Sequence, residues 1–257
     1  PVCRLKSKVS MRREKIYFTD RQAICVFPNE RSEIPQAIAD LNLKDRYAVI
    51  VLIGGDMDDH QAEVTLNAIQ TIAKIAEDQH AAVVCGGTNM GVMAAIGQIK
   101  QEKHYKFPLV GVAPEGLVAW PGGPRSTKFL WWGEKRWQLE SHYSHFILIP
   151  GSQFGDESPW IVDTATCLSR DDRSITILIN GGEISRKDIE LSLEHGRPVI
   201  VLSRTGRLAD ELASQPNRHE LITVVPASAE RQIVETVRTF LSVNERIVLA
   251  ESPTNTA

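Results

Sequence analysis

The 257-residue sequence has little cysteine and no long apolar run. Its four cysteines form no CxxC pair, and Cys25, Cys85 and Cys167 lie in apolar segments, where free thiols behave as small hydrophobic side chains. No apolar stretch approaches the roughly 18–20 residues of a membrane span, and the N-terminus lacks the apolar region of a secretory signal. We therefore expect a soluble, cytoplasmic chain without disulfides or a membrane span.

An excess of charge of one sign is lacking as well. Lysine and arginine total 29 and aspartate and glutamate total 32, so the formal net charge is −3 at pH 7. Such a chain has no general attraction for nucleic acids or anionic membranes, and we expect a small-molecule or protein partner instead. Hydrophobic (42%) and charged (24%) fractions near the globular average exclude disordered, collagen-like and coiled-coil chains.

The two ends of the chain differ from the rest. Residues 1–15 carry six lysines and arginines and one glutamate, so we expect a basic N-terminal arm that is either frayed or a weak anion-binding segment. Residues 246–257 are expected to form a polar tail or a linker. Because single cores stop growing near roughly 250–300 residues, residues 16–245 are predicted to form one domain.

Short β-branched runs alternate with longer amphipathic ones between these ends. Continuous apolar runs are typical of parallel strands that are covered on both faces. Strands are predicted over residues 23–27, 47–53, 81–85, 109–113, 145–149, 175–179, 198–202 and 221–225, and helices over 61–79, 91–103, 159–169, 185–195, 207–214 and 227–241. The alternation predicts an α/β, Rossmann-like, doubly wound fold with a mainly parallel central sheet and helices on both faces, in which ligands bind outside the carboxyl ends of the strands.

Six successive predicted strands end in glycine-bearing loops, which this fold would gather at one edge of the sheet. Glycine admits close backbone approach, and the N–H groups that begin a following helix bind anions, so the loops predict a phosphate or nucleotide site. The alternative is that these glycines serve only as helix caps and turns. The candidate glycines are Gly54, Gly55, Gly86, Gly87, Gly91, Gly116, Gly151, Gly155, Gly181 and Gly206.

The strongest of these loops is residues 86–91, Gly-Gly-Thr-Asn-Met-Gly, which precedes an apolar predicted helix. Thr88 is expected to cap that helix and to donate a hydrogen bond to a phosphate oxygen. No loop has the GxGxxG spacing of a dehydrogenase, and none is followed by a Walker lysine. Hydride transfer and NTP hydrolysis are therefore disfavoured.

Charged residues fall in the same loops, and each has a structural alternative. Residues 56–60 (Asp-Met-Asp-Asp-His) are expected to cap a helix rather than to bind a metal or ribose hydroxyls. Glu157 follows Asp156 at a predicted helix start, where it could be held by the helix dipole, orient a ribose or act as an acid or base. Arg204 and Arg207 could clamp a pyrophosphate or form surface salt bridges. His142 and His145 suit hydrogen bonds at a strand edge, and no metal site is predicted.

Residues 117–140 interrupt the α/β rhythm. They contain four of the five tryptophans, Trp120, Trp131, Trp132 and Trp137, among prolines and basic residues. This segment could form a lid over a planar ligand, a homo-oligomer contact or an insertion packed on the domain. Stacking on nucleic-acid bases is disfavoured by the net charge.

A resemblance to a known family lies in six ordered runs: LIGGDMDD (52–59), VVCGGTNMGVM (83–93), LVGVAPEG (109–116), SHYSHFILIPGSQFGDE (141–157), ITILINGG (175–182) and PVIVLSRTGRLADEL (198–212). Together they resemble the SLOG superfamily, and more narrowly its prokaryotic LSDAT branch, which is related to the cytosolic N-terminal domain of TRPM cation channels. The similarity covers residues 45–215. It implies a Rossmann-like domain that binds ADP-ribose, an NAD derivative or another nucleotide and acts as a sensor for an attached or associated effector, without a required cofactor.

The resemblance also implies which positions contact the ligand. Pro150 and the apolar Ile161 and Val162 depart from the TRPM pattern. The positions carried over are Gly54, Gly55, Gly86, Gly87, Thr88, Asn89, Gly91, Pro114, Gly116, Ser203, Thr205, Gly206 and Arg207.

A more distant resemblance is to the LOG-type, lysine-decarboxylase-like phosphoribohydrolases, whose signature is PGGxGTxxE. Here Pro150-Gly151 begins similarly, but Ser152 replaces the second glycine, and Glu157 comes only two residues after Gly155. Sensors of this superfamily are usually not catalysts, so binding is the main expectation. The alternative is hydrolysis of the N-glycosidic bond of a nucleoside 5′-monophosphate, with Glu157 as the catalytic residue.

Overall fold

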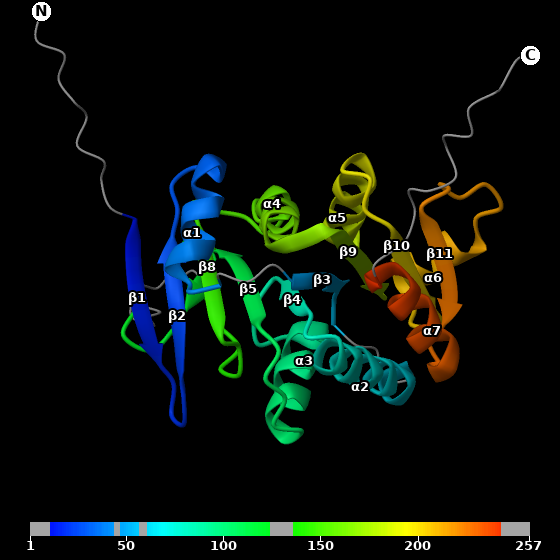
Figure 1. The fold of residues 1–257 in the computed structure, drawn as a ribbon, viewed down its shortest axis with the longest axis horizontal. Helices are drawn as coiled ribbons and strands as arrows, with labels where there is room; N and C mark the ends of the chain where they lie inside the picture. The colour runs from blue at the N-terminus through cyan, green and yellow to red at the C-terminus, as the bar shows by residue number, and fades with distance from the viewer. Residues whose placement is uncertain (1–10, 44–46, 57–60, 124–135, 243–257) are drawn as a thin grey trace, which may run out of the picture.

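Nine strands form one central sheet in the computed structural model, which describes residues 11–43, 47–56, 61–123 and 136–242 (Figure 1). Their order is β1-β2-β8-β5-β4-β3-β9-β10-β11, and β1 alone runs antiparallel to its neighbour. The strands are β1 (Arg12–Tyr17), β2 (Gln22–Phe27), β3 (Tyr47–Gly54), β4 (Ala82–Cys85), β5 (Leu109–Pro114), β8 (His145–Ile149), β9 (Ser169–Ile179), β10 (Val199–Ser203) and β11 (Ile222–Pro226).

The predicted strands are all present, which confirms the α/β, mainly parallel fold. Each agrees with its prediction to within one residue at either end, except that β9 begins at Ser169, well before residue 175. Two further short strands, β6 (Val118–Ala119) and β7 (Trp137–Gln138), pair with each other at the two ends of the tryptophan-rich segment. Residues 124–135 of that segment lie outside the described residues.

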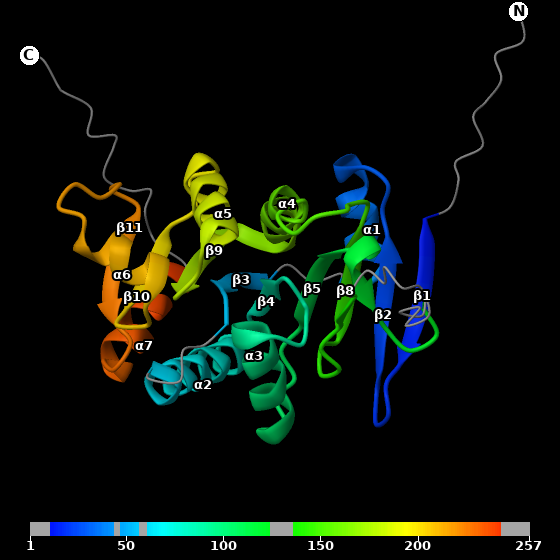
Figure 2. The same ribbon diagram turned by 180° about the vertical axis from the view of Figure 1, so that it is seen from behind.

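Helices cover both faces of the sheet (Figures 1 and 2). On one face lie α1 (Ile34–Asp40), α4 (Ser158–Leu168), α5 (Glu183–Glu194) and α6 (Arg207–Ser214), and on the other lie α2 (Ala62–Asp78), α3 (Gly91–Glu102) and α7 (Glu230–Leu241). The six predicted helices are all found, and α1 was not predicted. It follows a short 3₁₀ turn, η1 (Arg31–Glu33), and is only seven residues long, too short for a clear helical period.

Alternation along the strands divides the core into two layers. In β3, Ile50 and Leu52 pack against α2, α3 and α7, whereas Val49, Val51 and Ile53 pack against the opposite helices. All five are almost fully buried. Side chains that alternate between two apolar layers explain why the strand sequence is a continuous apolar run.

The basic stretch that was predicted as an arm contributes an edge strand. Residues 12–15 belong to β1, which pairs with β2 across a tight turn closed by the hydrogen bond from Phe18 N–H to the Arg21 carbonyl (2.9 Å). Only Ile16 of this strand is buried, and Arg12 stacks on the Phe27 ring at 3.4 Å. Charged side chains on an edge strand discourage pairing with other chains, which accounts for the basic composition. Residues 1–10 and 243–257 lie outside the described part of the chain.

The winding of the sheet reverses between β3 and β9. From β3 the chain crosses through α2 to β4 on one side, whereas from β9 it crosses through α5 to β10 on the other side. Such a reversal leaves a crevice outside the carboxyl ends of the two strands, where open α/β sheets bind ligands. Within the described residues no helix is long and apolar enough to cross a membrane.

Candidate functional site

A cavity of about 410 Å³ opens at this reversal, which we call the switch-point cavity. It lies between the loops after β3 and β4 on one side and the starts of α4, α5 and α6 on the other. Its volume falls in the range of small-molecule sites, roughly 300–1,000 Å³. An apolar wall is formed by Leu52, Ile53, Met90, Met93 and Ile161.

Asn180 joins the two strands that flank the cavity. Its side chain accepts hydrogen bonds from the N–H groups of Gly55 (2.7 Å) and Gly181, and it donates to the Asp56 carbonyl at 2.8 Å. Its own N–H donates to the Thr205 hydroxyl at 2.8 Å. Asn180 therefore ties the loops after β3, β9 and β10 together, a role that the sequence analysis did not assign to it.

Arg207 is the basic residue of the switch-point cavity. It is the first residue of α6, and its guanidinium lies against Gly55 and Gly182, where a Cβ atom would come within 3.0 Å and 2.6 Å of it. Among the described residues it has no carboxylate or carbonyl partner. A guanidinium that is exposed to a cavity and lacks an acceptor is suited to bind a phosphate in a bidentate manner.

The backbone at the start of α6 is not available to a ligand. The N–H groups of Leu208 and Ala209 donate to the carbonyls of Gly181 (3.4 Å) and Asn180 (2.9 Å), and Gly206 N–H donates to Asp210 at 3.1 Å. The helix start therefore holds the loop after β9. An anion at this point would contact the Arg207 side chain rather than the helix N-terminus.

Helix α5 also begins at the cavity. Its N-cap is Gly182, and Gly182, Glu183, Ile184 and Ser185 all line the cavity. Arg186 is the first residue of this helix whose N–H bonds within it, to the Gly182 carbonyl at 3.0 Å. The preceding N–H groups have no acceptor within the helix, as at every helix N-terminus. The helix was predicted to begin only at residue 185, although the loop before it, with Gly181, was among the predicted glycine loops.

The loop of residues 86–91 differs from its prediction in one respect. The N-cap of α3 is Met90, so Thr88 does not cap the helix. Thr88 instead forms a β-bridge with Leu139, and Asn89 N–H donates to the Gln138 carbonyl at 2.8 Å. Thr88 and Asn89 therefore contact the segment before β8, and α3 begins at Gly91, as the sequence predicted. Thr88 still lines the cavity, whereas Asn89 points to solvent.

Two glycines of this loop serve packing. Gly87 has a φ of +76°, and a Cβ there would lie 2.8 Å from Gly111 Cα and 3.3 Å from the Phe146 ring. Gly91 has a φ of +47°, and a Cβ there would lie 2.2 Å from the Gly55 carbonyl oxygen. Close approach of β4 to β5, and of α3 to the loop after β3, therefore requires glycine at both positions.

Two buried carboxyl groups line the switch-point cavity. Glu157 and Asp188 are each 7% exposed. Glu157 Oε2 accepts a hydrogen bond from Gly155 N–H at 2.7 Å, but burial raises its pKa to about 7, and the Asp188 and Asp156 carboxylates add to the shift. Burial also raises the pKa of Asp188 to about 6. At pH 7 Glu157 is therefore about half protonated, whereas Asp188 is mostly ionised and takes up its proton as the pH falls toward 6.

An aromatic pair stands at the edge of the cavity. The rings of Trp137 and Phe154 meet edge to face, with centroids 6.1 Å apart and an interplanar angle of 64°. Trp137 belongs to the tryptophan-rich segment, and it is the residue of the described part of that segment that lines the cavity. Trp120 is instead buried beside Phe27 in the core. Trp131 and Trp132 lie outside the described residues.

Six of the sequence-predicted residues line the cavity: Gly54, Gly55, Gly86, Thr88, Glu157 and Arg207. The other eleven lie around it or away from it: Gly87, Asn89, Gly91, Pro114, Gly116, Gly151, Gly155, Gly181, Ser203, Thr205 and Gly206.

Those eleven residues have identifiable contacts of their own. Pro114, Gly116 and Gly151 pack on one another at the ends of β5 and β8, where a Cβ on Gly116 would lie 2.6 Å from the Gly151 carbonyl oxygen. The Ser203 carbonyl accepts from Ala227 N–H at 3.0 Å. The Gly155 carbonyl accepts from Lys187 Nζ at 2.6 Å. They shape the loops rather than the cavity wall.

The remaining charged candidates do not all lie at the cavity. Arg204 is exposed and does not line the cavity, so the clamp of Arg204 with Arg207 is not formed. Asp56 lines the cavity but does not cap α2, whose N-cap is Gln61; residues 57–60 lie outside the described part. His142 Nδ1 lies 2.6 Å from Glu140 Oε1, and no group of three metal-ligating side chains occurs among the described residues.

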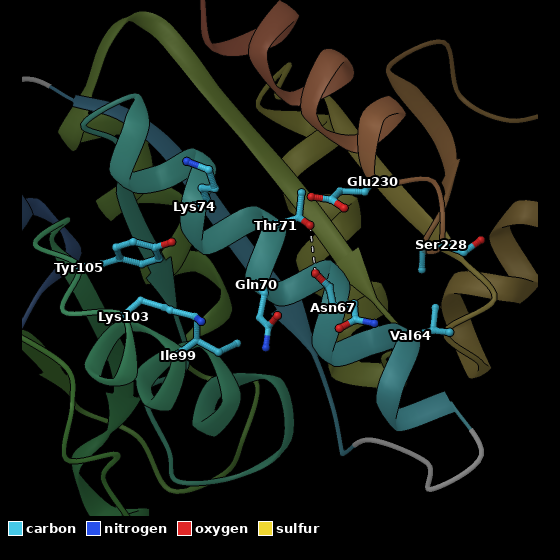
Figure 3. A pocket seen from close by; sticks show the side chains of 11 residues that line it. Val64, Asn67, Gln70, Thr71, Lys74, Ile99, Lys103, Tyr105, Ser228 and Glu230 are labelled. Atoms are coloured by element: carbon cyan, nitrogen blue, oxygen red, sulfur yellow. Dashed lines mark hydrogen bonds between the residues drawn. The ribbon is translucent and has the colours of Figure 1, made fainter.

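A second cavity of about 630 Å³ lies within the helical layer formed by α2, α3 and the start of α7 (Figure 3). Two of its polar lining side chains interact locally: the Thr71 hydroxyl donates to the Asn67 carbonyl (3.0 Å), and Lys74 Nζ lies 3.0 Å from Asp78. None of the sequence-predicted residues lines it. The switch-point cavity is therefore the candidate site.

The part of the chain that contains these loops matches a known protein family. The family model described as SLOG in TRPM, prokaryote, matches residues 47–244. The chain belongs to this family. It is also 23% identical, over 199 residues, to transient receptor potential cation channel subfamily M member 2 of Mus musculus, and 21% identical, over 197 residues, to the same protein of Rattus norvegicus. The mouse match covers 64% of this chain but only 13% of the channel.

Solved structures share the fold of this SLOG domain. The molybdenum cofactor binding protein of Rippkaea orientalis has a TM-score of 0.53 and 14% sequence identity, and covers 77% of this chain and 99% of that one. The molybdenum cofactor carrier protein of Chlamydomonas reinhardtii has a TM-score of 0.51 and 16% identity, and covers 76% and 99%. At these identities the likeness concerns the fold alone.

Proposed function

We propose that the switch-point cavity binds a phosphorylated nucleotide derivative of the ADP-ribose or NAD type, and that the domain acts as a cytoplasmic sensor for an attached or associated effector. The observation that carries this proposal is the Arg207 guanidinium, which faces the cavity without a partner among the described residues, next to the start of α5. A guanidinium and a helix N-terminus that face one cavity both favour a phosphate.

The rest of the cavity suits the other parts of such a ligand. The apolar wall and the Trp137–Phe154 pair offer a surface for a planar base. Burial raises the pKa of Glu157 to about 7, so near neutral pH this group carries its proton for part of the time and repels a phosphate less than a fully ionised carboxylate would. The mammalian relatives are cation channels by name, and a binding domain that controls an effector is consistent with that relationship.

Calorimetric titration with ADP-ribose, NAD and AMP tests the proposal. Arg207→Gln should weaken the binding of whichever probe binds at least tenfold, because a charge-assisted hydrogen bond contributes about 1.5–3 kcal/mol. Arg204→Gln is the matched control, because this exposed arginine lies three residues away and does not line the cavity; its affinity should stay within about twofold of the wild type. Equal affinities of the two variants, or no binding of any probe, would overturn the proposal.

A second function is favoured by one observation, the pair of buried carboxyl groups. An acid with a pKa near 7 beside a second carboxyl group is the arrangement of many glycosidic acid–base pairs. Glu157 could then protonate the base of AMP while water adds to the ribose carbon, which gives adenine and ribose 5-phosphate. Chromatography of the titrated samples separates the two functions. Intact AMP supports a sensor, whereas cleavage that is lost in Glu157→Gln supports a hydrolase.

A further inference from the structure

Asp188 is a buried carboxylate whose hydrogen bonding is incomplete. It lies on the cavity-facing side of α5, against the start of α4, and is 7% exposed. Among the described residues its Oδ1 has no hydrogen-bond partner, nor does the neighbouring Ser158 hydroxyl, although that hydroxyl lies close enough to lower the pKa of Asp188 somewhat. A buried acceptor without a partner is unfavourable by roughly 1–3 kcal/mol. Such an unpaired acceptor is tolerated where a ligand donates the missing hydrogen bond, or where the group has another functional role.

The adjacent Glu157 is in a different state. One of its oxygens already accepts from the Gly155 N–H, so that its carboxyl group is held in place at the start of α4. Asp188 is therefore the member of the pair that can still accept a hydrogen bond from a ligand, whereas Glu157 is already held in place by one. Together, one proton-retaining carboxyl group and one open acceptor can both donate and accept hydrogen bonds.

The position of Asp188 along α5 sets its distance from the phosphate-binding end. Asp188 follows Glu183, the first residue of the helix, by five positions, which places it about 7.5 Å further along the axis at 1.5 Å per residue. This separation is comparable to the span between the 5′-phosphate and the ribose hydroxyls of a nucleotide. A ligand with its phosphate at Arg207 and the start of α5 would therefore bring its ribose to the two carboxyl groups.

We propose that Asp188, beside Glu157, accepts hydrogen bonds from the vicinal hydroxyls of the ligand's ribose, and that the switch-point cavity thereby selects ribonucleotides over deoxyribonucleotides. This inference rests on the proposed function and adds the determinant of sugar specificity. Each hydroxyl of a vicinal diol donates and accepts, which matches a pair of carboxyl groups that shares protons. A metal ion fits the pair less well, because the described residues hold no third ligand nearby.

The test compares AMP and ADP-ribose with their 2′-deoxyadenosine counterparts by calorimetric titration. The wild-type protein should prefer the ribose form by at least tenfold, since one lost hydrogen bond to a charged group corresponds to about that factor. Asp188→Asn should reduce the preference to less than about threefold, because the amide is a weaker acceptor than a carboxylate. Glu190→Gln, an exposed carboxylate on the same helix, is the matched control and should keep the full preference.

The possible results distinguish a failure of the role of Asp188 from a failure of the proposed nucleotide binding. If none of ADP-ribose, NAD and AMP binds, the proposed function fails and the sugar specificity fails with it. If the ribose forms bind but the deoxy forms bind equally well, or if Asp188→Asn keeps the tenfold preference, only the role of Asp188 is overturned. A merely structural role for Asp188 would weaken both forms alike. A thermal melt of each variant shows whether it is folded.

Discussion

At the scale of single residues, the switch-point cavity combines groups whose chemistry depends on burial. Glu157 is an ordinary glutamate in the sequence, and its pKa of about 7 arises because α5 and the start of α4 enclose it. Asp188 behaves in the same way, with a pKa of about 6. Both carboxyl groups therefore change protonation within the range in which cells operate, unlike exposed acids.

These raised pKa values predict how stability depends on pH. Below about pH 4.5 Glu157 is protonated in both the folded and the unfolded chain; between pH 4.5 and 7 the unfolded chain loses the proton first. The free energy of unfolding should therefore fall as the pH rises through this window. Glu157→Gln cannot ionise, and it should exceed the wild type in stability at pH 8 by on the order of 2 kcal/mol.

Urea denaturation at pH 5 and pH 8 measures this difference. The gain of Glu157→Gln should be small at pH 5 and larger at pH 8, and the slope that remains should come partly from Asp188. Asp156 has a lowered pKa because it accepts from the N–H groups of Ser152 and Gln153, so its contribution is lost only below the tested range. A variant less stable than the wild type at pH 8 would show that Glu157 is favourably ionised in the folded chain.

Which residues lie at the site could be predicted from the sequence better than what each of them does there. Gly54, Gly86 and Arg207 were predicted from glycine loops and do line the cavity. Asp188 was missed because it lies within a helix rather than in a loop. A signal was present, since Ser185, Asp188 and Ser192 are polar residues at the helical spacing of a buried face. Buried polar residues at such positions mark a cavity or a network.

At the scale of elements, the loop between β4 and α3 shows that neighbouring glycines have different functions. A Cβ on Gly86 meets nothing within 4 Å, whereas a Cβ on Gly87 would contact Gly111 at 2.8 Å. Gly87 also has a positive φ, which L-residues with side chains adopt at an energetic cost. From the sequence alone both glycines were predicted to be phosphate-loop residues. Their different roles become visible only once β4 is seen to pair with β5.

This difference predicts unequal effects of two alanine substitutions on stability. Gly87→Ala should lower the free energy of unfolding by about 2–3 kcal/mol, because backbone strain adds to a contact that β5 cannot relieve. Gly86→Ala should change the free energy of unfolding by less than about 0.5 kcal/mol and act mainly on ligand binding. Denaturant melts of both variants provide the measurement. Equal destabilisation would mean that the close approach to Gly111 is not tight.

The elements that escaped prediction are those that tertiary contacts stabilise. Helix α1 has only seven residues, and β1 is a charged segment with a single buried side chain. Neither has a periodic apolar pattern long enough to detect, because each is held by a neighbour: α1 packs on α4 and β1 pairs with β2. The parallel strands, by contrast, are apolar along most of their length and were predicted to within one residue at each end, except for the start of β9.

At the scale of the whole molecule, the alternation of strands and helices predicted the doubly wound fold, but not where the winding reverses. Strand order depends on contacts between segments that are far apart in the chain. Position 180 follows Gly55 by 125 residues, yet its side chain bonds to the Gly55 backbone. The two halves of the sheet therefore meet at a residue that no local pattern distinguishes.

Asn180 should consequently affect the whole domain and not only the loop that contains it. Asn180→Ala removes the acceptor for Gly55 N–H and the donor to the Asp56 carbonyl, both at a 2% exposed position. Loss of these buried bonds should lower the free energy of unfolding by about 2–4 kcal/mol. It should also weaken ligand binding, because the loops after β3 and β9 would no longer be held together.

Asn42→Ala is the matched control, because Asn42 also has a positive φ (63°, against 48° for Asn180) but lies exposed at the end of α1. It carries a comparable backbone penalty without the bridging hydrogen bonds. Thermal melts should therefore show a much larger decrease for Asn180→Ala than for Asn42→Ala. Equal decreases would assign the whole effect to backbone conformation, and the hydrogen bonds of Asn180 would then contribute nothing to holding the two loops together.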